Sequence, residues 1–316
     1  STLAGGYDAV LSDVWGVIHN GVAATPAACE ALTLFRKQGG TVILITNAPR
    51  PGAVVTKFLD KLNVPRSAYD GIVSSGDVTR AVMAARAGKN VFHIGPERDL
   101  PIFDGLGLDF VPLDRADYVV CTGLRDDTIE TAETYRAELE LIRKRNLFMV
   151  CGNPDVVVER GHELVYCAGA IADLYRDMGG EVSYCGKPYR PIYDEALIQV
   201  AKARGKVPVH NRVIAIGDSI RTDLTGAGKY GLDCLFVTAG IHAEELGHRD
   251  APDLSALNRM FADAGIAPRA VMSRSSDCGR SGSSKPITDD GRTTLSVETN
   301  TKRSTPKRSA RTATTS

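Results

Sequence analysis

The chain has 316 residues, a formal net charge of +0, and 43% hydrophobic against 24% charged residues. These values are typical of a globular protein that is long enough for a large core and more than one domain. No apolar run approaches the length of a membrane span, and residues 1–7 lack the basic and apolar regions of a secretory signal, so we expect neither. The seven cysteines are scattered and form no CxxC pair, which favours free thiols in a reducing cytoplasm and excludes a zinc site.

The N-terminal quarter alternates strand and helix signals. An apolar run over residues 9–11 leads to a lone carboxylate, Asp13, and Gly16 follows where the chain must turn. Further predicted elements are a helix from Pro26 to Gly39 with Thr25 as its N-cap, a strand over 41–45, a helix over 51–62 and a strand over 71–76. This βαβαβ order predicts an α/β fold with a doubly wound parallel sheet.

A second α/β pattern follows, and then the first pattern resumes. Predicted strands in the middle cover 90–95, 118–123 and 147–151, and predicted helices cover 129–145 and 169–178. The resumed pattern consists of a helix over 191–204, a strand over 212–218 that ends in a carboxylate, a helix over 223–230 and a strand over 234–237.

Residues 273–316 differ in composition from the rest of the chain. They carry nine Lys/Arg against four Asp/Glu and almost no large apolar residues. We predict a low-complexity, disordered tail, because such a segment cannot bury enough surface to order itself. A basic tail is compatible with nucleic acid, but this one has no aromatic residue for stacking, so we expect no nucleic-acid partner.

Four short motifs stand at the ends of predicted strands or the starts of helices. They are Asp13-Val14-Trp15-Gly16, Thr46-Asn47, Gly186-Lys187-Pro188 and Gly217-Asp218-Ser219-Ile220-Arg221-Thr222-Asp223. Carboxylates are the ligands that Mg²⁺ prefers, and lysine, hydroxyl and backbone N–H groups hold phosphoryl oxygens. An aspartate can also attack phosphorus to form an aspartyl-phosphate. Taken singly, each motif is equally compatible with an ordinary turn or helix cap.

In this order the motifs resemble the haloacid dehalogenase-like (HAD) phosphohydrolases, and specifically their class IIA branch, over about residues 7–272. That branch contains p-nitrophenyl-phosphatase-like and sugar-phosphate phosphatases. Its members carry an α/β cap between the second and third motifs, with an Asn-Pro-Asp segment that Asn153-Pro154-Asp155 matches here. The resemblance implies a Rossmann-like HAD core over residues 1–76 and 184–272 and an inserted α/β cap over 77–183.

The resemblance also implies a role for each matching residue. Asp13 would be the nucleophile and a Mg²⁺ ligand, and Lys187 would neutralise charge between the nucleophile and the phosphate. The Trp15 backbone carbonyl and Asp218 would also bind the metal, with Asp223 in its outer shell. Thr46 and Asn47 would bind the phosphoryl oxygens. Asn153 and Asp155 would contact the substrate.

One position departs from the family pattern. The first motif of the family is Asp-x-Asp, and its second aspartate protonates the leaving oxygen and then activates water; Trp15 stands there in this chain. An indole can do neither, and the loss of a positioned acid–base group typically costs roughly 10²–10⁴-fold in rate. His19 is near in sequence, but nothing in the motif assigns it that role.

Two functions from different classes therefore remain open. The first is a Mg²⁺-dependent phosphohydrolase that acts slowly on a small phosphorylated metabolite, such as a sugar phosphate, through an aspartyl-phosphate. The alternative is a non-catalytic, phosphometabolite-binding or regulatory HAD-like protein, and phosphoryl transfer to an acceptor other than water is a third possibility. The sequence does not fix the assembly, for which a homodimer is one option.

Overall fold

The computed structural model describes residues 4–86, 88–160, 163–247, 252–273, 287–289 and 292–294. By their contacts, the residues form two units, 1–279 and 280–316. Among the described residues, every helix is too short or too polar to cross a membrane.

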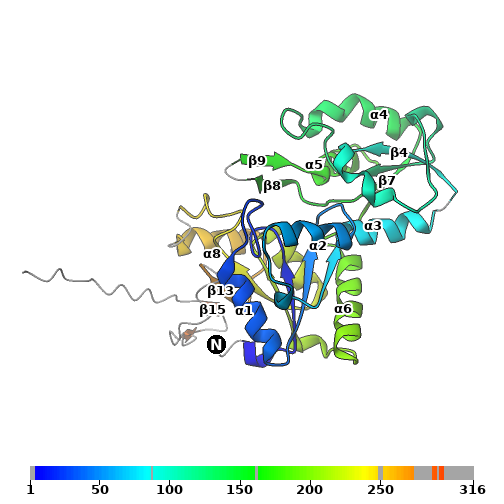
Figure 1. Cartoon of the computed structure of the whole chain (residues 1–316). Coiled ribbons are helices and arrows are strands. Elements are labelled where there is room, and N and C mark those ends of the chain that lie inside the picture. The colour runs from blue at the N-terminus through cyan, green and yellow to red at the C-terminus, as the bar shows by residue number, and fades with distance from the viewer. Residues whose placement is uncertain are drawn as a thin grey trace, which may run out of the picture. The chain divides into compact units, whose positions relative to one another are not determined.

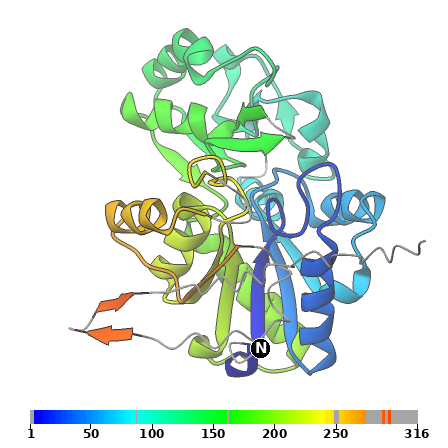
Figure 2. The same ribbon diagram turned by 90° about the vertical axis from the view of Figure 1, so that its left-hand side faces the viewer.

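A six-stranded parallel sheet forms the core of the first unit, in the order β13-β12-β11-β1-β2-β3. Its strands are β1 (Ala9–Asp13), β2 (Thr41–Thr46), β3 (Gly71–Ser74), β11 (Val213–Gly217), β12 (Asp233–Val237) and β13 (Ala270–Met272). Every residue of β1 and β2 is buried, as expected for parallel strands that are covered on both faces. Figure 2 shows β1, in dark blue, in the middle of this sheet. The predicted α/β class is confirmed.

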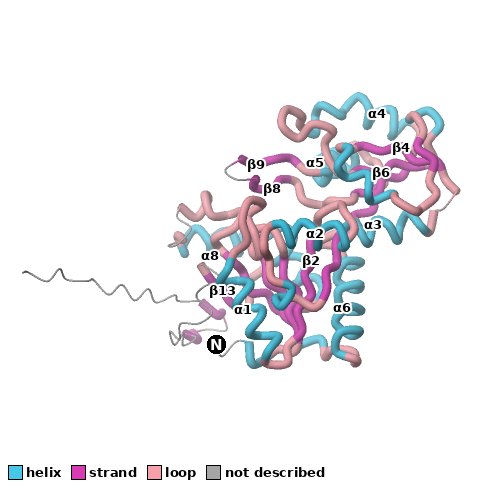
Figure 3. The backbone as a smooth tube through the Cα atoms, viewed as in Figure 1, coloured by secondary structure: helices cyan, strands magenta, loops and turns pink. Residues whose placement is uncertain are grey.

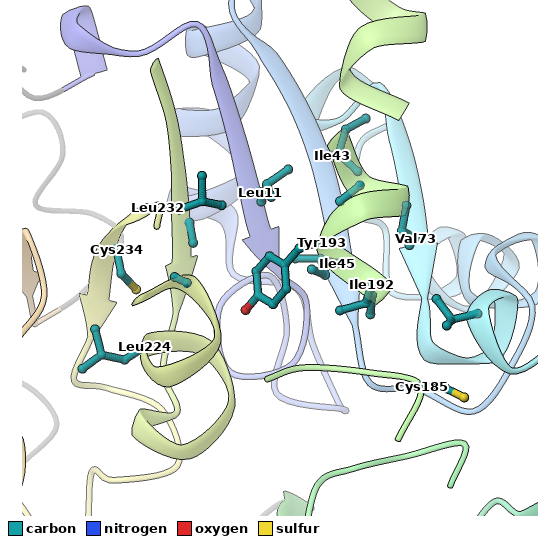
Figure 4. Close-up of a cluster of buried hydrophobic side chains, with 14 of the residues drawn as sticks. Leu11, Ile43, Ile45, Val73, Cys185, Ile192, Tyr193, Leu224, Leu232 and Cys234 are labelled. Atoms are coloured by element: carbon teal, nitrogen blue, oxygen red, sulfur yellow. The ribbon is translucent and has the colours of Figure 1, made fainter. Parts of the chain in front are cut away.

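Helices cover both faces of the core sheet, because alternate strand residues point to opposite sides. Val10, Val42 and Ile214 pack with α1 (Pro26–Lys37) and α2 (Gly52–Lys61). Leu11 and Ile43 belong to the opposite cluster (Figure 4). That cluster includes residues of α6 (Arg190–Arg204), α7 (Thr225–Tyr230) and α8 (Leu254–Asp263). Figure 1 shows α1 and α6 on opposite sides of the sheet.

A second sheet is inserted between β3 and β11, in the order β10-β7-β6-β4-β5 and again parallel. Its strands are β4 (Asn90–Ile94), β5 (Asp109–Phe110), β6 (Tyr118–Cys121), β7 (Phe148–Cys151) and β10 (Val182–Tyr184). Helix α3 (Ser75–Ala84) leads into this region, which we call the cap, and α4 (Arg136–Lys144) and α5 (Ala168–Asp177) pack on its sheet. An antiparallel hairpin of β8 (Val157–Arg160) and β9 (Glu163–Tyr166) completes it (Figure 3). The limits 77–183 for the cap remain a prediction.

Several predicted boundaries were wrong for local reasons. The strand predicted over 71–76 ends at Ser74, because Ser74 caps α3 in a reciprocal capping box with Asp77. The helix predicted over 129–145 starts as a 3₁₀ turn at Ala132, because Asp126 and Thr131 cap turns before it. Thr25 is extended at the start of α1, but its side chain makes no capping hydrogen bond.

The helix predicted over 223–230 is present as α7, which starts two residues later, at Thr225, after a short π-helix. The short helices are the 3₁₀ segments Ala4–Gly6, Arg66–Ala68, Glu97–Phe103, Leu113–Arg115, Ala132–Tyr135 and His210–Arg212 and the π-helix Ile220–Leu224. Helices α3 and α8, the β8–β9 hairpin and the short strands β5, β10 and β13 were not predicted.

The predicted disorder of residues 273–316 falls mostly outside the described residues. Within that stretch the structure describes Ser273 and two short strands, β14 (Ile287–Asp289) and β15 (Arg292–Thr294), which pair antiparallel. Strand β13, which immediately precedes the stretch, pairs with β12 at the edge of the core sheet.

Candidate active site

Three predicted site residues meet at one edge of the core sheet. Asp13 and Thr46 end β1 and β2, and Asp218 directly follows β11. Because β11, β1 and β2 are parallel neighbours, their carboxyl ends lie side by side, where open α/β sheets bind ligands. All three side chains are buried and line a cavity of about 650 Å³, which Lys187 and Asp155 also line.

Lys187 links two carboxylates in this cavity. Its Nζ donates to Asp13 Oδ1 at 2.6 Å and to Asp223 Oδ1 at 2.7 Å, and all three residues are buried. Burial opposes the lysine charge, but the two carboxylates outweigh it and hold the pKa of Lys187 well above its usual value. Lys187 is therefore a fixed positive charge beside Asp13.

Asp13, Asp218 and Asp223 form a group that suits a hard cation. Their nearest oxygens lie within 4.8 Å of one another. Burial, and then the charge of Asp223, raise the pKa of Asp13 and raise that of Asp218 to about 7, which shows how poorly these negative charges are balanced by the protein alone. An all-oxygen donor set with excess negative charge fits Mg²⁺.

Backbone groups fix the orientation of this carboxylate group. Asp223 Oδ2 accepts the N–H groups of Asp218 and Ser219 at 3.2 and 3.1 Å, and Asp218 Oδ2 accepts the Ile241 N–H at 2.9 Å. Gly16 turns the chain with φ +82°, and a Cβ on it would lie 2.0 Å from Asp218 Oδ2. The chain at Trp15 and Gly16 therefore packs directly against the Asp218 carboxylate, and only glycine fits at position 16.

Asn47 connects the second motif to the third motif and to the cap. Its Oδ1 accepts the Lys187 N–H at 2.7 Å, and its Nδ2 donates to the Lys187 carbonyl at 3.0 Å and to Asp155 Oδ1 at 2.9 Å. A phosphoryl contact from Asn47 would therefore use its backbone N–H. A Cβ on Gly186 would lie 2.4 Å from Asn47 Oδ1, which explains the glycine before Lys187.

The Asn-Pro-Asp segment forms the turn after β7 and reaches the core site. Asn153 Oδ1 accepts the Asp155 N–H at 3.1 Å, and the Asp155 carbonyl accepts the Gly169 N–H at 3.0 Å. Asp155 lines the cavity and Asn153 does not. Burial raises the pKa of Asp155, against the opposing effects of Lys187 and Asn47. Asn153 thus shapes the turn, and its contact with substrate remains a prediction.

Trp15 and His19 lie together on the loop after β1. Their rings pack edge to face with centroids 5.0 Å apart, and both residues line the cavity. His19 is 2% exposed, its Nδ1 accepts the Gly21 N–H at 2.9 Å, and burial lowers its pKa to about 4. His19 is therefore neutral near pH 7, and its basic nitrogen is occupied.

The structure adds two site residues that the sequence analysis did not identify. The His242 ring lies between the Ile220 N–H at 3.3 Å and Glu245 Oε2 at 2.8 Å, which places it on the cavity wall after β12. Arg221 lines the same cavity and pairs with Asp173 of α5 in the cap. Arg221 stands within the fourth motif, but nothing in its spacing indicates a partner in the cap, and no motif marks His242.

Comparisons with known proteins relate the chain to hydrolases. Residues 10–109 match the haloacid dehalogenase-like hydrolase family, and residues 184–262 match a HAD-hydrolase-like family. A haloacid dehalogenase-like hydrolase from Brucella suis is 44% identical, with a TM-score of 0.77 over 86% of this chain and 96% of that chain. Ribonucleotide monophosphatase NagD of Escherichia coli is 24% identical over 73% of this chain and 88% of that protein.

A third relative has been solved in complex with metal ions. The glycerol phosphate phosphatase of Mycobacterium tuberculosis, solved with calcium, is 25% identical, with a TM-score of 0.58 over 76% of this chain and 68% of that chain. The same protein has been solved with magnesium.

The chain belongs to the HAD-like hydrolase family, in its class IIA branch. It is a hydrolase of the phosphate-monoester class. The metal-bound relative and the carboxylate group of Asp13, Asp218 and Asp223 support Mg²⁺ as its cofactor.

Proposed function

We propose that the protein hydrolyses the phosphate monoester of a small metabolite, with Mg²⁺ bound, through an aspartyl-phosphate on Asp13. The observation that carries this proposal is the Lys187 ammonium, which is buried between Asp13 and Asp223 beside a carboxylate group that suits a cation. Phosphoryl transfer requires mainly positioning and charge stabilisation, and this arrangement supplies both.

Each residue has a defined part in this proposal. Asp13 attacks phosphorus, Lys187 holds the developing negative charge, and Thr46 with the Asn47 backbone N–H holds the other phosphoryl oxygens. Asp13, Asp218 and the Trp15 carbonyl would hold Mg²⁺, with Asp223 orienting that group through Lys187 and the backbone. When bound, the ion supplies positive charge that offsets repulsion between the carboxylate and the phosphate.

Asp13→Asn tests the nucleophile. The amide is a poor nucleophile and a poor metal ligand, so we expect a folded protein that releases no phosphate above background. Magnesium-dependent phosphate release from p-nitrophenyl phosphate is the assay, and a melting curve controls for folding. Release at the wild-type rate from the folded variant would contradict the proposed nucleophile.

We propose a sugar phosphate or a similar small phosphate ester as the substrate. Two relatives are named for a ribonucleotide monophosphate and for glycerol 3-phosphate. Beyond the polar end, the cavity is walled by Trp15 and by Val156, Val157 and Val158 of the cap. The test is a screen of sugar phosphates, nucleotides and pyridoxal phosphate, with and without Mg²⁺.

Trp15 predicts that the breakdown of the aspartyl-phosphate is the slow step. Attack by Asp13 needs no group at position 15, whereas hydrolysis of the intermediate needs an activated water. With p-nitrophenyl phosphate, a burst of one equivalent of p-nitrophenol should therefore precede slow turnover. Trp15→Asp should raise the steady-state rate by about 10²-fold if the carboxylate reaches the water. Rapid-quench kinetics of both proteins decide this; no burst and no gain in a folded variant would contradict it.

Trp15 also favours a second candidate, a phosphometabolite-binding protein without turnover. Such a protein would bind a phosphate ester by calorimetry and release no phosphate from any substrate in the screen. Phosphoryl transfer to an alcohol acceptor would instead consume the ester with less than one equivalent of free phosphate.

We further propose a cytoplasmic location, which the free and buried state of Cys29, Cys121, Cys151, Cys167, Cys185 and Cys234 supports. Cell fractionation tests the location. A homodimer remains a prediction, and light scattering tests the assembly.

A further inference from the structure

We propose that Asp155, on the cap, takes the acid–base role that Trp15 cannot fill, at a lower rate than an aspartate in the first motif would: it protonates the leaving oxygen and then takes a proton from the attacking water. This inference rests on the proposed function, because it assigns a proton donor to that same site. Asp155 is not part of the first motif, and a carboxylate in this role on the cap would make catalysis depend on the cap itself.

The other titratable groups of the cavity are already committed. Asp13 is the nucleophile, Asp218 belongs to the cation group, and Lys187 is held charged by two carboxylates. The Arg221 guanidinium does not lose its proton near neutral pH. Among the described residues that line the cavity, His19, His242 and Asp155 remain as candidates for proton transfer.

Both histidines already have hydrogen-bond partners at ring nitrogens in the structure. Both ring nitrogens of His242 are engaged, by the Ile220 N–H and by Glu245. His19 is buried, and its Nδ1 already accepts the Gly21 N–H. His19, neutral and with its basic nitrogen occupied, can neither donate at a useful pH nor accept.

Asp155 has the chemistry and the placement that the role requires. One carboxylate oxygen of Asp155 accepts a hydrogen bond from Asn47 Nδ2. The same Asn47 side chain forms hydrogen bonds with the backbone N–H and the carbonyl of Lys187. Asp155 is thus tied, through a single side chain, to the lysine that contacts the nucleophile. Burial raises the pKa of Asp155, which increases the protonated fraction that a general acid needs.

The turn around Asp155 is rigid and carries its side chain in from the cap. Asn153 accepts the Asp155 N–H, and helix α5 begins against the Asp155 carbonyl, where Gly169 leaves no room for a Cβ. The core strands hold the phosphoryl end of the cavity, whereas Asp155 and the neighbouring valines bound it from the cap. The leaving group lies on the side of phosphorus opposite Asp13, so a donor from the cap is suited to it.

The two proton transfers balance. Asp13 forms a bond to phosphorus while the bond from phosphorus to the ester oxygen breaks; that oxygen keeps the electron pair, takes the proton of the Asp155 carboxyl group and leaves as an alcohol. Water then attacks the phosphorus of the aspartyl-phosphate and gives a proton to the Asp155 carboxylate. The bond to Asp13 breaks, and inorganic phosphate leaves with both groups restored.

The test compares leaving groups in Asp155→Asn. The alcohol of an alkyl phosphate such as glycerol 3-phosphate needs a proton to leave, whereas p-nitrophenolate hardly does. We expect single-turnover alcohol release to fall by roughly 10²–10⁴-fold, while the p-nitrophenol burst keeps its rate within about threefold and its steady state slows. Asp127→Asn is the control, because Asp127 is a cap carboxylate paired with Arg98 and Arg160 and does not line the cavity.

Rescue by a small acid covers the case in which the amide distorts the turn. In Asp155→Ala, the imidazolium ion of an added imidazole buffer should restore alcohol release in proportion to its concentration, which a purely structural aspartate would not allow. An equal loss of burst and alcohol release, without rescue by imidazolium, overturns the role of Asp155 and leaves the proposed function standing. Absence of phosphate release by the wild-type protein with either substrate overturns both.

Discussion

Single contacts at the site explain why these residue types occur where they do. The Gly-Lys-Pro motif has glycine because the Asn47 carboxamide occupies the space where a Cβ would be. The first motif has Gly16 because Asp218 lies against it. In both cases the constraint comes from a partner far away in the sequence.

Gly186→Ala should uncouple Lys187 from Asn47 with little loss of fold. The new methyl group would overlap Asn47 Oδ1, so the carboxamide must move and release the Lys187 backbone. A displacement of this size typically costs about 10²-fold in rate. Steady-state phosphate release measures it, and Gly6→Ala, whose Cβ would meet no atom, is the control. Activity of Gly186→Ala equal to that of the control would contradict the role of this contact.

Two histidines, the buried His19 and the partly buried His93, should make the fold sensitive to acid. Burial lowers the pKa of both His19 and His93 to about 4, from an ordinary value near 6.5. Above pH 6.5 each histidine is neutral in both the folded and the unfolded protein, so its neutral burial does not reduce the free energy of unfolding there. As the pH falls from 6.5 toward 4, the unfolded chain binds protons that the folded protein does not bind, and the free energy of unfolding decreases. Each histidine accounts for up to about 3 kcal/mol of this loss.

His93→Gln tests the pH effect away from the site. Urea unfolding at pH 7 and pH 4 should show a smaller loss of stability in the variant than in the wild type. If the variant loses as much stability between pH 7 and pH 4 as the wild type does, His93 is not a source of the acid sensitivity.

The placement of Asp13, Thr46 and Asp218 could be predicted from the sequence, because each stands at the end of a predicted strand. Asp13, Thr46 and Asp218 meet because neighbouring parallel strands end at one edge, and the α/β pattern already required that. The bonds from Asn47 to Lys187 and Asp155 could not be predicted, because they join residues 108 and 140 positions apart with no spacing rule. The neutral state of His19 depends on a burial that the loop sequence does not show.

At the scale of elements, long apolar runs were predicted correctly and short elements were missed. Strands β1 and β2 are continuous buried runs, which any reading of hydrophobic pattern detects. Strands β10 and β13 have three residues each, too few for a period to appear, and they form only because a neighbouring strand offers hydrogen bonds. Helix α3 was taken in part for a strand because its cap, Ser74, also ends β3.

Strand β13 should mark the point in a truncation series at which the melting temperature falls. A chain ending at Ser273 keeps the pairing of β13 with β12 and should melt close to the full-length protein. A chain ending at Arg269 loses that strand and the contact of Val271 with the core, worth about 1–3 kcal/mol, or a few degrees in melting temperature. Thermal unfolding of both chains is the measurement, and equal melting temperatures would contradict a structural role for β13.

At the scale of the whole molecule, the cap and the core are joined at the site itself. Asn47 contacts Asp155 and Arg221 pairs with Asp173 at the cavity, and Arg50 pairs with Asp99 outside the residues that line it. The resemblance predicted a cap at this place in the chain and a contact of its Asp155 with the substrate, but it did not predict the hydrogen bond from Asn47 that ties Asp155 to the core.

Binding of Mg²⁺ should stabilise the folded protein independently of turnover. The ion binds only the assembled carboxylate group, so stability should rise by about 2.7 kcal/mol at a concentration 100 times its dissociation constant. Melting curves with Mg²⁺ and with a chelator measure this, and Asp218→Asn should abolish the difference. A shift of the same size in Asp218→Asn would place the ion elsewhere.

The proposed function depends on phosphorylation of Asp13. The most direct measurement is an acid quench of the wild-type protein within the burst with p-nitrophenyl phosphate, followed by peptide mass spectrometry. We predict a phosphoryl group on Asp13, in an amount equal to the burst, and none in Asp13→Asn. Turnover without a phosphorylated peptide, or with the phosphoryl group on another residue, would contradict the account.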